Sequence, residues 1–91
     1  MSREANAAAQ EAFQSEGLSP ETWSNEPGYR YGEHTHPYHK VLFCVGGSIT
    51  FHTPDGDVMM RPGERLDLPP GTPHSATVGP GGVTCMEAAR D

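Results

Sequence analysis

Short runs of apolar residues, separated by glycine and proline, follow one another along the chain after residue 40. Residues 41–45 are continuously apolar, and residues 48–53 alternate so that Ile49 and Phe51 share one face, as in a half-buried strand. We predict strands at residues 41–45, 48–53, 58–61, 66–68, 74–78 and 83–88. Strands this short, with turns at regular spacing, indicate a small antiparallel sandwich or barrel.

Glycine pairs and Asp-Gly or Pro-Gly steps are read as the turns of this pattern. Gly46-Gly47 is predicted to be a hairpin turn, and residues 79–82 are predicted to connect the last two strands. The expected core is apolar and lies between these turns: Leu42, Phe43, Val45, Ile49, Phe51, Val58, Leu66, Leu68 and Val83. Methionine fills irregular gaps, so Met59, Met60 and Met86 are expected in the core or along a cavity.

The first residues read as a helix rather than a strand. Residues 3–16 are rich in Ala, Glu and Gln, with Ser2 as N-cap and Gly17 as C-cap. The apolar stripe is narrow, and it is expected to hold the helix weakly, either as a frayed arm or as an arm docked on a partner subunit. We therefore divide the chain into an N-terminal helix or arm, residues 1–25, and a single barrel domain, residues 26–91.

Size and charge limit the function. A chain of 91 residues forms one domain with a small core, which a homodimer would supplement. The net charge of −6 and the scattered basic residues argue against a nucleic-acid partner. No apolar segment is long enough to span a membrane and no signal peptide is visible, so we expect a cytoplasmic protein. Cys44 and Cys85 are expected to be buried reduced thiols, with a cross-strand pair as the alternative.

Three histidines form the most distinctive chemical pattern. His34 and His36 are two residues apart, so in a strand both side chains project to the same side. His74 follows a loop that contains Pro70-Gly71, and it would add a third imidazole. Three imidazole nitrogens on one side of an ion suit a divalent transition metal such as Zn, Ni, Fe, Cu or Mn, and leave coordination positions free.

Two segments around these histidines resemble the sequence motifs of the cupin superfamily. The first cupin motif, Gly-x5-His-x-His-x3-Glu-x6-Gly, corresponds to Gly28, His34, His36, Lys40 and Gly47. The second, Gly-x5-Pro-x-Gly-x2-His-x3-Asn, corresponds to Gly63, Pro69, Gly71, His74 and Val78. Eight of these ten positions match. The resemblance implies an all-β fold, a small antiparallel jelly-roll barrel, with a metal held by His34, His36 and His74.

The main departure from the cupin pattern is Lys40, which stands where the resemblance implies a metal-binding glutamate. Lys40 shares parity with the histidines, so it should face the cavity and pair with an anionic substrate or a neighbouring carboxylate. Weaker metal affinity, a low-pKa base and a charge carried to the barrel mouth are alternatives. Arg30 shares that parity and is a second predicted substrate-binding residue, with a solvent-facing arginine as the alternative. Glu64 and Glu87 are the nearby carboxylates that could substitute for the missing ligand, but Glu64 directly follows Gly63 and is expected to have a local role in the turn. His39 and His52 are expected at the surface.

Three functions follow from the resemblance. The first is a metal-binding small-molecule cupin, such as a metal-dependent dioxygenase or isomerase acting on a small anionic substrate. The second is a ligand-binding or sensor cupin without catalysis, and the third is a structural cupin with an empty barrel. Catalytic residues are not assigned, and the chain is expected to bind a small molecule rather than nucleic acid or a membrane.

Overall fold

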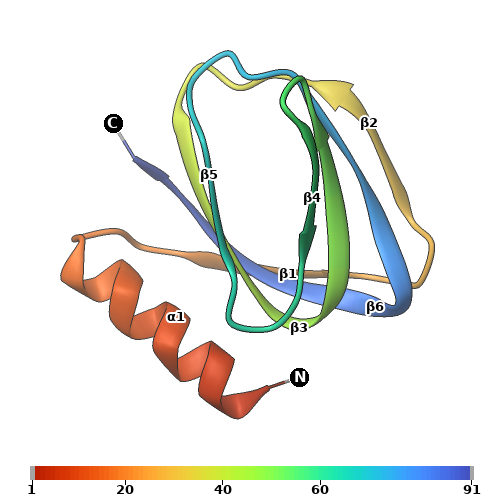
Figure 1. The fold of residues 1–91 in the computed structure, drawn as a ribbon. Coiled ribbons are helices and arrows are strands. Elements are labelled where there is room, and N and C mark those ends of the chain that lie inside the picture. Colours follow the sequence, from red (N-terminus) through yellow and green to blue (C-terminus); the bar gives the residue numbers. More distant parts are fainter. Residues whose placement is uncertain (1, 91) are drawn as a thin grey trace.

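The computed structural model describes residues 2–90, which form one helix and a set of antiparallel strands. The elements in chain order are α1 (Arg3–Ser15), β1 (Glu21–Asn25), β2 (Arg30–His34), β3 (His39–Thr53), β4 (Gly56–Met60), β5 (Arg65–Leu68) and β6 (His74–Arg90). Figure 1 shows the strands wrapped into a barrel, with α1 outside it at the lower left. The predicted small antiparallel jelly roll with a short N-terminal helix is therefore confirmed.

Two long strands, β3 and β6, run side by side, and each contributes one part to either half of the barrel. The first part of β3 pairs with β5, and the last part of β6 pairs with β1. The second part of β3 pairs with β4, and the first part of β6 pairs with β2. Because β3 and β6 bend together, one antiparallel ladder closes a small core that neither half could enclose alone.

The predicted turn at Gly46-Gly47 and the predicted turn at residues 79–82 are both wrong. The chain passes through each of them within a single strand, and the β3–β6 register shifts there as bulges. Gly47 has a φ of 68°, and a Cβ built on it would lie 2.0 Å from the carbonyl oxygen of Gly82. These glycines serve a close backbone approach at a bend, which explains why a turn signal occurs inside a strand.

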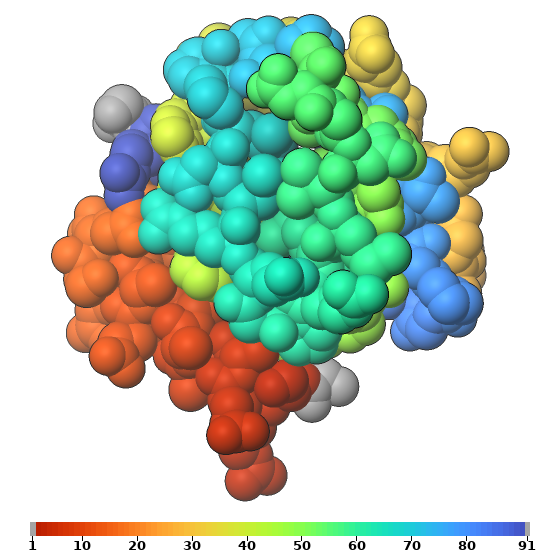
Figure 2. Space-filling view, in the orientation of Figure 1, coloured from red at the N-terminus to blue at the C-terminus, as the bar shows by residue number. Residues whose placement is uncertain are grey.

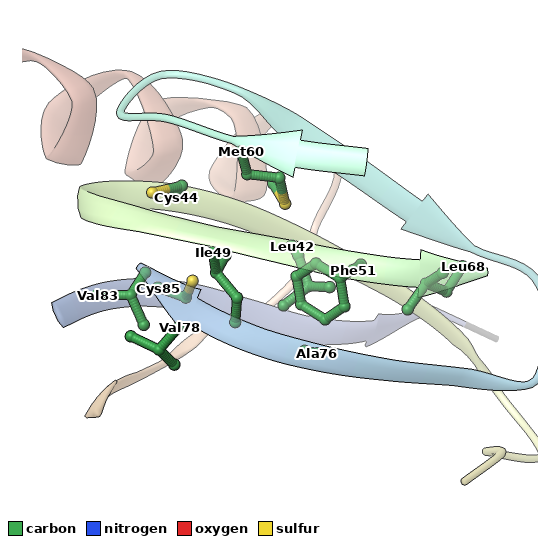
Figure 3. Close-up of a cluster of buried hydrophobic side chains, with 10 residues drawn as sticks. All are labelled: Leu42, Cys44, Ile49, Phe51, Met60, Leu68, Ala76, Val78, Val83 and Cys85. Atoms are coloured by element: carbon green, nitrogen blue, oxygen red, sulfur yellow. The ribbon is translucent and has the colours of Figure 1, made fainter. Parts of the chain in front are cut away.

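Five of the nine predicted core residues are buried inside the barrel (Figure 3). The buried residues within it include Leu42, Ile49, Phe51, Leu68 and Val83. Val58 and Leu66 are only partly buried, while Phe43 and Val45 face outward under the helix. Met60 and Met86 are buried, but Met59 is 53% exposed, so the prediction for Met59 is wrong. The reason is alternation, because Met59 and Met60 lie next to each other on β4 and point to opposite faces.

Helix α1 packs on the outer face of its own barrel (Figure 2), so neither the frayed arm nor the partner-docked arm describes it. Ala5, Ala9 and Phe13 are buried against β3 and β6, and the Phe13 and Phe43 rings meet edge to face at 5.3 Å. Ser2 caps the helix by accepting a hydrogen bond from the Ala5 amide. Alanine side chains are small and let the helix lie close to the barrel, so a narrow apolar stripe is sufficient to hold it there.

Ion pairs fasten the end of α1 to the strands beneath it. Glu16 pairs with Arg65 on β5, at 2.5 Å, and with Arg90 on β6. Strand β1, residues Glu21–Asn25, pairs with β6 and is part of the barrel, although sequence analysis assigned it to the N-terminal arm. Among the described residues, no helix is long and apolar enough to cross a membrane.

Candidate metal centre

The three predicted histidines meet at one end of the barrel because three different segments deliver them. His34 is the last residue of β2, and His74 is the first residue of β6. These two residues lie directly opposite each other in the β2–β6 ladder. His36 stands in the loop between β2 and β3, so it reaches the cluster from a segment outside the ladder.

The imidazoles are close enough to share one ion. The ring centroids are 4.3 Å apart for His34 and His74, 4.9 Å for His34 and His36, and 5.3 Å for His36 and His74. The ligand nitrogens of all three residues lie within 4.8 Å of one another. His74 is buried, His36 is half-buried and His34 is exposed, so the cluster has an inner and an outer side.

Hydrogen bonds to the backbone fix which nitrogen of two rings is available. The Nδ1–H of His34 donates to the Gly32 carbonyl at 2.7 Å, and the Nδ1–H of His74 donates to the Thr72 carbonyl at 2.9 Å. Since a carbonyl only accepts, both rings carry their proton on Nδ1 and present the Nε2 lone pair. Metal-binding histidines are commonly oriented by such a bond from the other ring nitrogen.

His36 carries the observation that most strongly indicates a missing partner. Its Nε2 atom is buried and has no hydrogen-bond partner within the described part of the chain. A buried polar nitrogen without a partner is costly unless an ion, a water molecule or a ligand group satisfies it. His36 belongs to the same three-histidine cluster as His34 and His74.

The surroundings keep two of the rings neutral. Burial, followed by the nearby Lys40 ammonium, lowers the pKa of His36. Burial also lowers the pKa of His74, and this effect outweighs the opposing hydrogen bond to Thr72. Neutral imidazoles are the form that binds a metal ion. With their orientation and the unsatisfied nitrogen, the three residues fit a divalent transition metal ion.

A cavity of about 240 Å³ adjoins the histidines. Its lining combines the apolar side chains of Leu42, Phe51 and Ala76 with the charged side chains of Lys40 and Glu87. It is completed by Trp23, Tyr31, His34 and His74. Lys40 lines the cavity, although it lies on β3 while β2 ends at His34, so alternation along a single strand does not connect the two residues. Its partner there is Glu87, whose Oε2 lies 3.4 Å from the Lys40 Nζ.

Arg30 does not face this cavity. A bulge between Tyr31 and His34 interrupts the β2–β6 ladder, and this breaks the alternation that placed Arg30 on the His34 face. Tyr31 lines the cavity in its place, and Arg30 is exposed at the start of β2. The substrate contact predicted for Arg30 therefore lacks the expected geometry.

The remaining histidines lie outside the cluster. His39 Nε2 contacts Asp67 at 2.8 Å, and His52 Nδ1 contacts Asp57 at the same distance. Both bonds connect side chains of neighbouring strands on the outside of the barrel. These two residues give matched controls for substitutions in the cluster.

Sequence reasoning missed the position of Glu87 within the cavity wall. Its Oε1 accepts a hydrogen bond of 2.8 Å from the Trp23 indole N–H, and its other oxygen faces Lys40. The strand order β1-β6-β3 places Glu87 between these two partners. The residue type was visible in the sequence, but the register of β6 was needed to place it, and the misread turn at residues 79–82 concealed that register.

Comparison with known proteins agrees with this architecture. The family model of the AraC-like ligand-binding domain matches residues 23–86. A crystal structure of the DMSP lyases RdDddP and RnDddQII is 27% identical, with a TM-score of 0.75 over 81% of this chain and 38% of that one. An RmlC-like cupin from Shewanella frigidimarina NCIMB 400 is 19% identical, with a TM-score of 0.70 over 79% of this chain and 64% of that one.

A third similar structure is KdgF from Halomonas sp., which is 20% identical, with a TM-score of 0.67 over 81% of this chain and 71% of that chain. The present chain spans well under half of the DMSP lyase chain that it matches. No curated protein matches the chain. The likenesses below 25% identity establish the fold.

Proposed function

This chain belongs to the AraC-like ligand-binding domain family of the cupin superfamily, and we propose that it is a metal-binding cupin for a small anionic molecule. His34, His36 and His74 would hold a divalent transition metal ion. The adjoining cavity would take the molecule, with Lys40 in its lining. The cupin resemblance of the two sequence motifs is confirmed by the family match and the cupin neighbours.

The buried, unsatisfied Nε2 of His36 is the observation that carries the proposal. A bound ion would satisfy this nitrogen, whose burial without a partner is otherwise costly. The orientation of the other two rings supports the same function, because the carbonyls of Gly32 and Thr72 leave both Nε2 atoms free. A divalent ion would satisfy the three nitrogens together.

The chain's own residues would bind and orient the small molecule. Lys40 would contact its anionic group, and the apolar side chains of Leu42 and Phe51 would exclude water from the cavity. A bound divalent ion supplies Lewis-acid polarisation of an oxygen atom. This combination suits an isomerase or, with a redox-active metal, a dioxygenase.

A ligand-binding module without catalysis is the second candidate, and the description of the matching family favours it. A lyase is a further candidate, because the DMSP lyase structure shares 27% identity with this chain. Turnover distinguishes these functions. Consumption of DMSP by the metal-loaded protein would favour the lyase, and tight retention of a ligand without turnover would favour the binding module.

Elemental analysis by plasma mass spectrometry tests the proposed function. The untagged protein is purified without chelator, and metal-free protein is then reconstituted with Zn, Ni, Fe, Cu or Mn. We expect one transition metal to be retained at close to one ion per chain. Failure to retain any of these ions would overturn the metal-binding function.

The assembly and location of the protein remain predictions. We propose a homodimer, because the chain is small and β1, β2, β4 and β5 each pair with a single neighbouring strand, which leaves edges that a second copy could use. Light scattering coupled to size exclusion measures the mass directly. We also propose the cytoplasmic location that the sequence predicts.

A further inference from the structure

The ion pair between Lys40 and Glu87 lies inside the cavity wall, beside the histidines. Both side chains line the cavity, and they are only 12% and 25% exposed. Glu87 has a second partner, because the Trp23 indole N–H donates to its Oε1 at 2.8 Å. The carboxylate of Glu87 therefore joins β1, β6 and β3 at one point of the wall.

The two bonds of Glu87 differ in length. The bond to Trp23 has the distance of a well-formed hydrogen bond, whereas Lys40 Nζ lies 3.4 Å from Oε2. Strong ammonium–carboxylate hydrogen bonds are shorter, at about 2.7–2.9 Å. Trp23 thus fixes the carboxylate, and Lys40 is held loosely. The pair is not needed to join the strands, because β3 and β6 already share a long backbone ladder.

The charges of the cavity indicate which molecule would enter it. An imidazole binds a metal ion in its uncharged form, so three imidazole ligands would leave a divalent ion its full positive charge. The Lys40 and Glu87 charges cancel. A loaded cavity therefore has an uncompensated positive charge in a partly buried place, which an anion would neutralise. At about 240 Å³, the cavity holds a small molecule, since one liquid water takes about 30 Å³.

We infer that the Glu87 carboxylate occupies the place beside the Lys40 ammonium that a carboxylate of the bound molecule would take. The molecule would be a small organic acid, with one carboxylate on Lys40 and a second oxygen directed toward the histidines. Glu87 is then an internal competitor, which stays bonded to Trp23 when Lys40 turns to the incoming carboxylate. This inference deepens the proposed function and rests on it at the histidine end, but the Lys40 end is testable without a metal.

Isothermal titration calorimetry with sodium malonate, at constant ionic strength, tests the inference. Malonate is titrated into zinc-reconstituted and metal-free forms of the wild type and of Glu87→Gln, Lys40→Met and Lys40→Arg. Glutamine still accepts from Trp23 but no longer competes for Lys40, so we expect Glu87→Gln to bind malonate about fivefold more tightly, or about 1 kcal/mol. Lys40→Met should bind at least about tenfold more weakly. Lys40→Arg should remain within about threefold of the wild type because it retains the charge.

If Glu87 had only a structural role, Glu87→Gln would not bind malonate more tightly than the wild type. Weaker or unchanged malonate binding by Glu87→Gln, in a variant with an unchanged far-UV spectrum, would overturn the inference. Wild-type affinity in Lys40→Met would overturn it as well, and Lys40→Arg shows whether charge or shape matters. Zinc binding is measured separately. If zinc does not bind but the variants keep this order in the metal-free form, the proposed metal site fails and the inference stands. If zinc binds and the order is lost, the inference fails alone.

Discussion

His34 and His74 face each other across the β2–β6 ladder, with ring centroids 4.3 Å apart and each Nδ1–H bonded to a nearby backbone carbonyl. The two residues are forty positions apart in the sequence, yet the Nδ1 atoms of both rings make the same kind of hydrogen bond, which leaves both Nε2 atoms free. The carbonyls belong to residues two positions earlier, Gly32 and Thr72. The same local hydrogen bond, from Nδ1 to the carbonyl two residues earlier, thus orients both rings.

Replacing His74 should remove the metal without removing the fold. Loss of the hydrogen-bond partner of a metal ligand lowers metal affinity by about 10- to 100-fold. His74→Ala removes the ligand itself, so we expect a larger loss of zinc affinity. The variant should be destabilised by about 1–3 kcal/mol, because the Thr72 carbonyl loses its donor. Competition with a chromogenic chelator measures the affinity. His52→Ala, outside the cluster, should bind zinc normally, and equal affinity in both variants would refute the assigned ligand.

Lys40 should oppose the metal, because its ammonium faces the same cavity as His34 and His74. Lys40→Glu removes this repulsion and adds a carboxylate that can serve as a fourth ligand. We therefore expect zinc affinity to rise by about tenfold or more. Without metal, the new carboxylate faces Glu87 and should lower the melting temperature. Lys40→Gln separates the two effects, with an intermediate zinc affinity. A lower affinity in Lys40→Glu would show that Lys40 supports the site.

Acid should destabilise the metal-free protein through His36, which is half-buried, and His74, which is buried. Burial lowers the pKa of His36 and of His74, so the folded state binds fewer protons than the unfolded chain. The stability therefore falls as the pH drops below about 6.5, the ordinary histidine pKa, and is unaffected by these groups above it. Urea denaturation across this range measures the slope. The double variant His36→Gln/His74→Gln should have a smaller slope, and an unchanged slope would contradict the assignment.

Gly47 should not tolerate a side chain. Its φ is 68°, and a Cβ would lie 2.0 Å from the Gly82 carbonyl oxygen, so Gly47→Ala strains the bend shared by β3 and β6. We expect a cost of about 1–3 kcal/mol or more, measured by urea denaturation. Gly32→Ala is the control, because a Cβ there meets nothing within 4 Å. Similar stability of the two variants would mean that the close approach is absent.

The two motifs and the apolar pattern were sufficient to predict the fold and the meeting of the three histidines. Motif spacing predicts which residues converge, and His34, His36 and His74 do converge. The helix was also predicted to within one residue at its C-terminal end, because Ser2 and Gly17 are local signals. Such signals act within a few residues and need no knowledge of the tertiary structure.

The misread turns, the position of Arg30 and the position of Glu87 depend on bulges or on strand register. Glycines at a bend look like glycines at a turn, and only the continuous β3–β6 ladder distinguishes them. The bulge between Tyr31 and His34 similarly moved Arg30 to the outside. Glu87 became part of the cavity through pairing with two strands that are distant in sequence. Local alternation cannot reveal an inserted residue, so these contacts could not be predicted from the sequence.

The most direct test of a three-histidine metal centre is a crystal structure of the zinc-reconstituted protein, with diffraction data collected on both sides of the zinc absorption edge. We predict one strong anomalous peak within bonding distance of the Nε2 atoms of His34, His36 and His74. A peak at another position, or no peak in protein that contains zinc by elemental analysis, would contradict the account.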